Sequence, residues 1–131
     1  MAKRIMIIDD EKDVVLYLKT LFEKNGYETE TAQDGDEGYP KAAACKPDLI
    51  TLDILMPKQS GIRLYTKLKE DEALKDVPVV VLTGLTQYQQ FYQQDFPEDE
   101  LPEAFVEKPI QQEELLKIVQ DLIGEADAPG E

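Results

Sequence analysis

Five polar side chains of this sequence could do chemistry together, because each lies at the carboxyl end of a short apolar run. They are Asp9, Asp10, Asp53, Thr83 and Lys108. Three carboxylates in one cleft repel one another, and a hard divalent cation that prefers oxygen ligands, such as Mg²⁺, relieves that repulsion. The lysine adds a compact positive charge that can meet an anion at the same place.

A site of this kind is suited to a phosphoryl group. A bound Mg²⁺ and the ammonium of Lys108 would neutralise the phosphoryl oxygens, and the hydroxyl of Thr83 would donate a hydrogen bond to one of them. A carboxylate held in that field can act as a nucleophile and become an aspartyl phosphate.

The composition excludes several other chemistries. The chain has 131 residues, which is the length of one domain, and 42% of them are hydrophobic. It has no histidine and one cysteine, which excludes a Ser-His-Asp triad, a histidine metal site and an internal disulfide. The net charge of −14 argues against direct binding to nucleic acid or to an anionic membrane. With no apolar stretch near ~18 residues, we expect a cytoplasmic protein.

The elements that must position these side chains alternate along the chain. Apolar runs predict strands at residues 5–8, 27–31, 48–52, 79–82 and 105–106. Helical spacing predicts helices from residue 11 to the stop at Asn25-Gly26, over 36–45 and over 61–72. A final amphipathic helix contains Leu115, Ile118, Val119 and Leu122 and ends at Gly124. Pro40 should kink the second helix or delay its start. The alternation predicts a parallel sheet with helices on both faces and a site at the carboxyl ends of its strands.

Four short motifs carry a resemblance to a known family. They are Ile8-Asp9-Asp10-Glu11, Asp53-Ile54-Leu55-Met56-Pro57 with Gly61, Leu82-Thr83-Gly84, and Lys108-Pro109. Together they resemble the receiver domain of two-component response regulators over about residues 4–124. The resemblance implies an α/β fold with a five-stranded parallel sheet, flavodoxin-like and doubly wound, in the order 2-1-3-4-5. We expect one receiver domain over 1–124 and a disordered acidic tail over 125–131.

The resemblance also implies a metal-binding role for each acid. Asp53 would be the phosphoacceptor. Asp10 would bind Mg²⁺ directly, together with Asp53 and the backbone carbonyl of Leu55, and Asp9 would hold the metal through a water. The adjacent acids Asp9-Asp10 could instead cap the following helix, a common use of aspartate.

The remaining roles concern the response to phosphorylation. The resemblance implies that Thr83 donates its hydroxyl to the phosphoryl group and that Lys108 pairs with that group. Phe105 matches the aromatic switch position, which turns inward when Thr83 moves. Phe105 is more simply a core residue, and the two interpretations are close to even because a switching residue must also pack. The Lys108-Pro109 bond is similar to the family's cis peptide, which would aim the lysine into the cleft.

The implied function is signalling rather than enzymatic turnover. A histidine kinase or a histidine phosphotransfer protein would supply the phosphoryl group, and we expect output by contact with a downstream protein. We expect a stand-alone receiver of the single-domain type, with a receiver cut from a larger regulator as the alternative. One alternative is a receiver-like interaction domain that works without phosphate. A less favoured one is an aspartyl-phosphate phosphohydrolase, whose usual Asp-x-Asp is missing here.

Residues 84–103 depart from the family's pattern. The family usually has a fourth helix and a small-residue turn here, whereas this segment contains Pro97 and Pro102 and no clean helical spacing. Its aromatic residues Tyr88, Phe91, Tyr92 and Phe96 either pack on the core or form an exposed patch for a partner. We expect an irregular segment that gives the protein a partner of its own.

Overall fold

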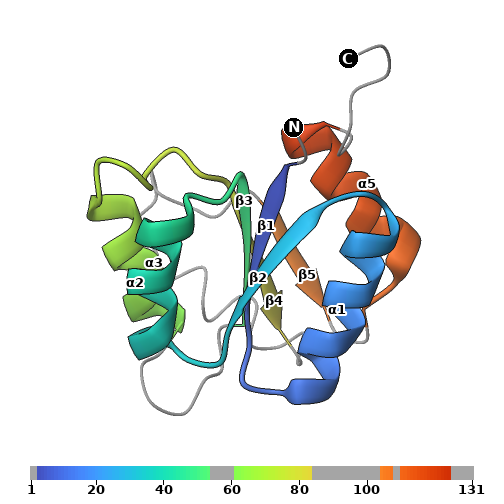
Figure 1. Ribbon diagram of the computed structural model, residues 1–131, viewed down its shortest axis with the longest axis horizontal. Helices are drawn as coiled ribbons and strands as arrows, with labels where there is room; N and C mark the ends of the chain where they lie inside the picture. The colour runs from blue at the N-terminus through green and yellow to red at the C-terminus, as the bar shows by residue number, and fades with distance from the viewer. Residues whose placement is uncertain (1–2, 54–60, 84–103, 108–109, 125–131) are drawn as a thin grey trace.

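A five-stranded parallel sheet forms the centre of the molecule, with the strands in the order β2-β1-β3-β4-β5 (Figure 1). The computed structural model describes residues 3–53, 61–83, 104–107 and 110–124. The strands are β1 Arg4–Ile8, β2 Glu28–Ala32, β3 Leu49–Asp53, β4 Val79–Thr83 and β5 Ala104–Glu107. The predicted strand order and parallel pairing are confirmed.

The apolar runs fold as strands because the sheet is covered on both faces. All five residues of β3 are buried, and so are the last four of β1. The edge strand β2 is polar and only its last residue, Ala32, is buried. The register pairs Ile8 with Leu52 and Asp53 with Leu82, so the carboxyl ends of the three central strands lie at one edge of the sheet.

Four described helices cover the sheet, two on each face (Figure 1). α1 Lys12–Lys24 and α5 Gln112–Ile123 cover one face, and α2 Gly35–Cys45 and α3 Gly61–Glu70 cover the other. Each pair closes its own core of fully buried side chains. The first core contains Leu18, Phe22, Leu115 and Val119, and the second contains Ala42, Leu64, Tyr65 and Leu68. Within the described residues, no helix is both long and apolar enough to cross a membrane.

The end of α1 follows the sequence signal at Asn25-Gly26. The backbone N–H of Asn25 donates to the carbonyl of Phe22 at 3.1 Å, and its side-chain amide donates to the carbonyl of Leu21 at 2.8 Å. Gly26 has a φ of 92°, a conformation that glycine adopts without a steric cost. The predicted stop is therefore confirmed.

The expectation that Pro40 delays the start of α2 is wrong. The helix begins at Gly35, one residue before the predicted range, and Pro40 lies inside it. Asp34 caps the helix, because its Oδ1 accepts a hydrogen bond of 2.9 Å from the backbone N–H of Glu37. This cap fixes the start, and Pro40 removes only one later intrahelical hydrogen bond. The predicted kink at Pro40 stays a prediction.

The helix α3 ends at Glu70, two residues before the predicted end. Asp71 ends it by turning the chain, since its Oδ1 accepts a hydrogen bond of 2.8 Å from the backbone N–H of Ala73. The other oxygen of Asp71 accepts a 2.5 Å hydrogen bond from the hydroxyl of Tyr39 on α2. Asp71 therefore stabilises the turn after α3 and also links that turn to α2.

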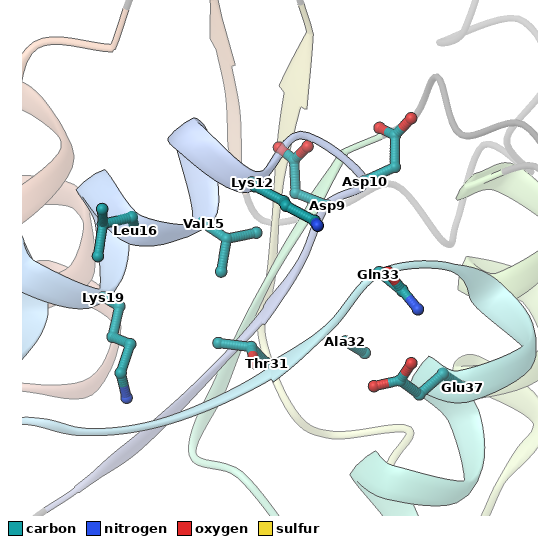
Figure 2. A pocket seen from close by; sticks show the side chains of 10 residues that line it. All are labelled: Asp9, Asp10, Lys12, Val15, Leu16, Lys19, Thr31, Ala32, Gln33 and Glu37. Carbon is teal, nitrogen blue, oxygen red and sulfur yellow. The ribbon is translucent and has the colours of Figure 1, made fainter.

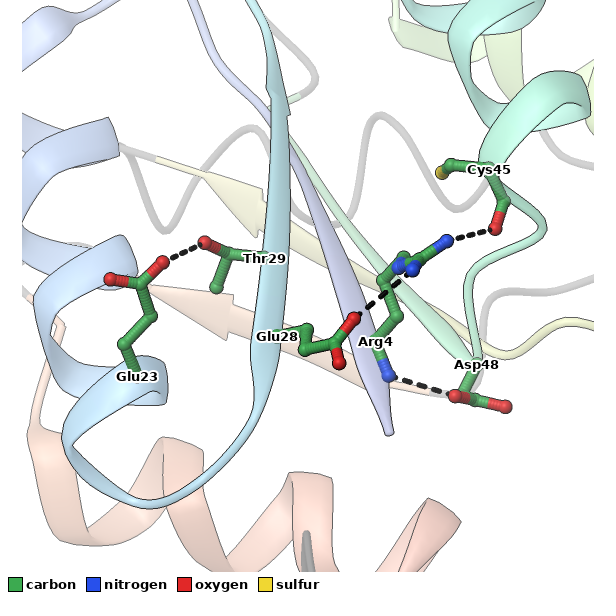
Figure 3. Close-up of polar contacts among 6 residues, drawn as sticks. All are labelled: Arg4, Glu23, Glu28, Thr29, Cys45 and Asp48. Atoms are coloured by element: carbon green, nitrogen blue, oxygen red, sulfur yellow. Dashed lines mark hydrogen bonds and ion pairs between the residues drawn. The ribbon is translucent and has the colours of Figure 1, made fainter. Parts of the chain in front are cut away.

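Arg4, the first residue of β1, links several elements at the amino-terminal edge of the sheet (Figure 3). Its guanidinium donates to the carbonyl of Cys45 at 2.7 Å and to Glu28 at 3.0 Å. Its backbone N–H donates to Asp48 at 2.8 Å. These contacts join β1 to β2 and to the connection before β3.

Both ends of α5 are held by tyrosine hydroxyls. Tyr17 on α1 donates to the carbonyl of Ile110, just before the helix, at 3.2 Å. Tyr27, just before β2, donates to the carbonyl of Gly124, just after the helix, at 2.8 Å. The ammonium of Lys3 also donates to the carbonyl of Ile123. Hydrogen bonds from neighbouring elements therefore hold α5 at both of its ends.

Two expectations fall outside the described residues. They are the irregular aromatic segment over 84–103 and the acidic tail over 125–131.

Candidate functional site

Asp9, Asp10 and Asp53 form a carboxylate cluster at the carboxyl edge of the sheet. One carboxylate oxygen from each lies within 4.8 Å of the other two. Asp9 directly follows β1 and Asp53 is the last residue of the neighbouring β3. Asp9 and Asp53 are buried, with exposed fractions of 1% and 3%, whereas Asp10 is exposed. The three acids that the sequence pointed to therefore come together.

Backbone hydrogen bonds fix the position of Asp9. Its N–H donates to the carbonyl of Ala32 at the end of β2, at 3.1 Å. Its Oδ1 accepts a hydrogen bond of 2.9 Å from the backbone N–H of Glu11. Glu11, and not Asp9 or Asp10, is the N-cap residue of α1, and its side chain makes no capping bond. The alternative that these two acids serve only as the helix cap is therefore wrong.

The donor set of this cluster fits a hard divalent cation. All three side chains offer carboxylate oxygens, which are the ligands that Mg²⁺ prefers. Two of the carboxylates are nearly inaccessible to water, so water can screen their mutual repulsion only weakly. The exposed Asp10 leaves one side of the cluster open to solvent. A cation could thus enter from solvent and offset the repulsion.

The structure describes only some atoms of the other predicted site residues. Thr83 is the last residue of β4, and β4 lies beside β3 in the sheet, so the backbone of Thr83 is at the same edge as Asp53. Phe105 lies in β5 opposite Val81. The side chains of Thr83 and Phe105, and all of Leu55, Lys108 and Pro109, lie outside the described residues, so their roles stay predictions.

A groove of about 300 Å³ adjoins the carboxylate cluster (Figure 2). It lies between α1, the end of β2 and the start of α2, and we call it the α1–β2 groove. Its lining includes Asp9 and Asp10, and also Lys12 and Gln33, which our sequence reasoning missed. Gln33 directly follows β2, so the rule that found Asp9 and Asp53 at strand ends could have found it too.

A model of the response regulator receiver domain matches residues 5–120 of the chain. The chain belongs to this family. Receiver domains are signalling domains of two-component response regulators, and the carboxylate cluster lies where the sequence motifs of the family predict it.

Three curated relatives show how the match is distributed. The transcriptional regulatory protein PhoP of Bacillus subtilis is 40% identical over 84 residues, which are 64% of this chain and 34% of that protein. The regulator RpaA of Synechocystis is 36% identical over 124 residues, which are 95% of this chain and 50% of that protein. The response regulator DivK of Brucella ovis is 30% identical over 96% of this chain and 100% of its own length. This receiver domain therefore spans half or less of the first two relatives and all of the third.

Solved receiver structures have the same fold. The signal receiver domain of a histidine kinase from Syntrophus aciditrophicus is 28% identical, with a TM-score of 0.82, over 99% of this chain and 100% of that one. The chemotaxis response regulator CheY4 of Vibrio cholerae is 25% identical, with a TM-score of 0.83, over 93% of this chain and 99% of that one. The strand order of the sheet and the similarity to these solved structures both show the flavodoxin-like α/β architecture.

Proposed function

We propose that this receiver domain, formed by residues 1–124, accepts a phosphoryl group on Asp53. The donor is a phosphohistidine of a histidine kinase or of a histidine phosphotransfer protein, and the step needs Mg²⁺. The observation that supports this most directly is the approach of three carboxylates to within 4.8 Å at one sheet edge. Acids placed so closely suit a site that holds a cation beside a carboxylate nucleophile.

The residues that would hold the metal follow from the cluster and from the family motif. Asp10 and Asp53 would bind it directly with the carbonyl of Leu55, and Asp9 would bind it through a water. When bound, Mg²⁺ supplies positive charge that offsets the negative charge of the carboxylates and of the incoming phosphoryl group. The burial of Asp9 and its bond from the Glu11 N–H keep that carboxylate in a fixed orientation.

The transfer is a substitution at phosphorus. An oxygen of Asp53 forms a bond to phosphorus while the phosphorus–nitrogen bond of the phosphohistidine breaks, and the electron pair of that bond stays on the imidazole nitrogen. The Thr83 hydroxyl donates to a phosphoryl oxygen and the Lys108 ammonium pairs with another. The product is an acyl phosphate on Asp53 and a free histidine on the donor.

The signal is the charge added at Asp53. A phosphoryl group adds about −1.5 to −2 charge. Thr83 moves toward the new group, Phe105 turns inward, and these movements pass the change to the surface. Output then occurs in the cytoplasm through contact with a downstream protein.

Incubation with phosphoramidate and Mg²⁺, followed by intact-protein mass spectrometry, tests this function. We expect one added phosphoryl group that is labile to base, and none in Asp53→Asn. A matched control is Asp76→Asn, because Asp76 is exposed in the turn before β4, away from the cluster. A wild-type protein that is never phosphorylated would refute the proposal, and continuous release of phosphate from many substrate molecules would indicate a phosphohydrolase.

A further inference from the structure

The α1–β2 groove contains polar groups that the metal cluster does not use. Lys12 is in the first turn of α1 and Gln33 follows β2, and both are exposed. Figure 2 shows the Lys12 ammonium directed into the groove below Asp9 and Asp10, with Gln33 across from it. The groove therefore places a cation and an amide beside the carboxylate cluster.

Lys12 is the available cation of this groove. The other lining lysine, Lys19, is already engaged, since its ammonium lies 2.8 Å from Glu23 and 3.1 Å from the hydroxyl of Thr29. Within the described part of the chain, neither Lys12 nor Gln33 has a hydrogen-bond or ion-pair partner. Their polar ends can bind a ligand without breaking an existing contact.

The groove also offers apolar surface of a suitable size. Val15 and Ala32 line it beside the polar groups (Figure 2). A volume of about 300 Å³ is at the lower end of the range for small-molecule sites. Such a space suits a small anion with a short alkyl part better than a large ring system.

Because the chain is strongly negative, Lys12 matters most for a phosphoryl donor whose leaving group is an anion. The net charge is −14 and the groove adjoins three carboxylates, so an anion near the cluster is repelled. When an acyl phosphate gives up its phosphoryl group, the leaving group is a carboxylate, which carries a full negative charge. When phosphoramidate does so, the leaving group is ammonia, which carries none.

We propose that Lys12 and Gln33 bind the leaving carboxylate of a small acyl-phosphate donor. An oxygen of Asp53 bonds to phosphorus, the bond between phosphorus and the acyl oxygen breaks, and its electron pair remains on the carboxylate that forms. The Lys12 ammonium stabilises this charge, the Gln33 amide donates to it, and Val15 and Ala32 contact the alkyl part. The inference rests on the proposed role of Asp53 as phosphoacceptor.

The test compares two donors on the same variants. Second-order rate constants for phosphorylation are measured with acetyl phosphate and with phosphoramidate for the wild type, Lys12→Gln and Lys12→Arg. Lys24→Gln is the matched control, because Lys24 is an exposed lysine in the last turn of the same helix. Thermal unfolding of each variant shows that it remains folded.

We expect Lys12→Gln to slow the reaction with acetyl phosphate about two- to fivefold, the effect of losing one exposed charge pair. The reaction with phosphoramidate should keep its rate, Lys12→Arg should restore most of the rate with acetyl phosphate, and Lys24→Gln should change neither. The difference should shrink as salt is added. Equal slowing with both donors, or no slowing with either, would overturn the leaving-group assignment. Absence of phosphorylation of the wild type by phosphoramidate would instead refute the proposed function itself.

Discussion

Replacing Asp10 by asparagine should stabilise the protein without metal and remove most of its stabilisation by Mg²⁺. Asp10 is exposed, and within the described residues its side chain has no hydrogen-bond or ion-pair partner. Asparagine has nearly the same size, so the substitution removes a charge from the carboxylate cluster and little else. The substitution therefore measures the electrostatic repulsion within the carboxylate cluster.

The structure sets the size of the effect. The three carboxylates lie within 4.8 Å of one another, and Asp10 is exposed, so water screens the two pairs that include it. With the dielectric constant of water, two unit charges 4.8 Å apart repel by about 0.9 kcal/mol, which is a lower bound for each pair. Asp10→Asn removes two such pairs, so the free energy of unfolding without metal should rise by about 1–2 kcal/mol. With Mg²⁺ at a hundred times its Kd, the wild type gains about 2.7 kcal/mol. The variant binds Mg²⁺ less well and gains less, so its advantage over the wild type should fall when Mg²⁺ is added.

Urea unfolding with a chelator and again with saturating Mg²⁺ measures both effects. Asp76→Asn serves as the control, because it removes an exposed charge outside the cluster and should leave the response to Mg²⁺ unchanged. If the Asp10 variant is no more stable than the wild type without metal, the repulsion argument is wrong. If it gains as much from Mg²⁺ as the wild type does, the cluster is not the metal site.

Three other substitutions test the fold that positions the site. Asp34→Ala removes the cap of α2 and should cost about 1 kcal/mol of unfolding free energy in urea titrations; an unchanged midpoint would contradict the role of its bond to Glu37. The hydrogen bond from the Tyr39 hydroxyl lowers the pKa of Asp71 below its usual 3.8, so Tyr39→Phe should lower the free energy of unfolding at pH 7. The difference in stability between the variant and the wild type should fade as the pH falls below 3.8, because protonated Asp71 no longer gains from the bond. A difference that stays constant across pH would refute this. Phe22→Ala, at a fully buried position, should lower stability by about 3–5 kcal/mol, and a loss below 1 kcal/mol would show that this core layer is loosely packed.

The sequence was sufficient to predict which acids meet. Asp9 and Asp53 lie far apart in the chain, yet each ends a buried apolar run, and parallel strands bring their carboxyl ends to one edge. That argument depends only on the period of the apolar residues and on the handedness of the connections. The strand order and the two helical faces followed from the same pattern and from the family motifs.

Features that depend on packing between elements were not predictable in this way. The hydrogen bond between Tyr39 on α2 and Asp71 after α3 joins residues that are distant in sequence. The groove beside Lys12 exists because of how α1 lies against the end of β2, and no linear pattern encodes that spacing. The start of α2 differs from the prediction for another reason. Asp34 is a typical cap residue, and its cap starts the helix at Gly35 although Pro40 lies inside it.

The two tyrosine bonds on α5 have a mechanical consequence. The Tyr17 hydroxyl donates to the backbone carbonyl of Ile110 just before the helix, and the Tyr27 hydroxyl donates to that of Gly124 just after it. If the bond at Ile110 alone is broken, α5 stays attached at Gly124 and can pivot there. The largest displacement would then fall on the end of α5 at Ile110, which is the end nearest the carboxylates.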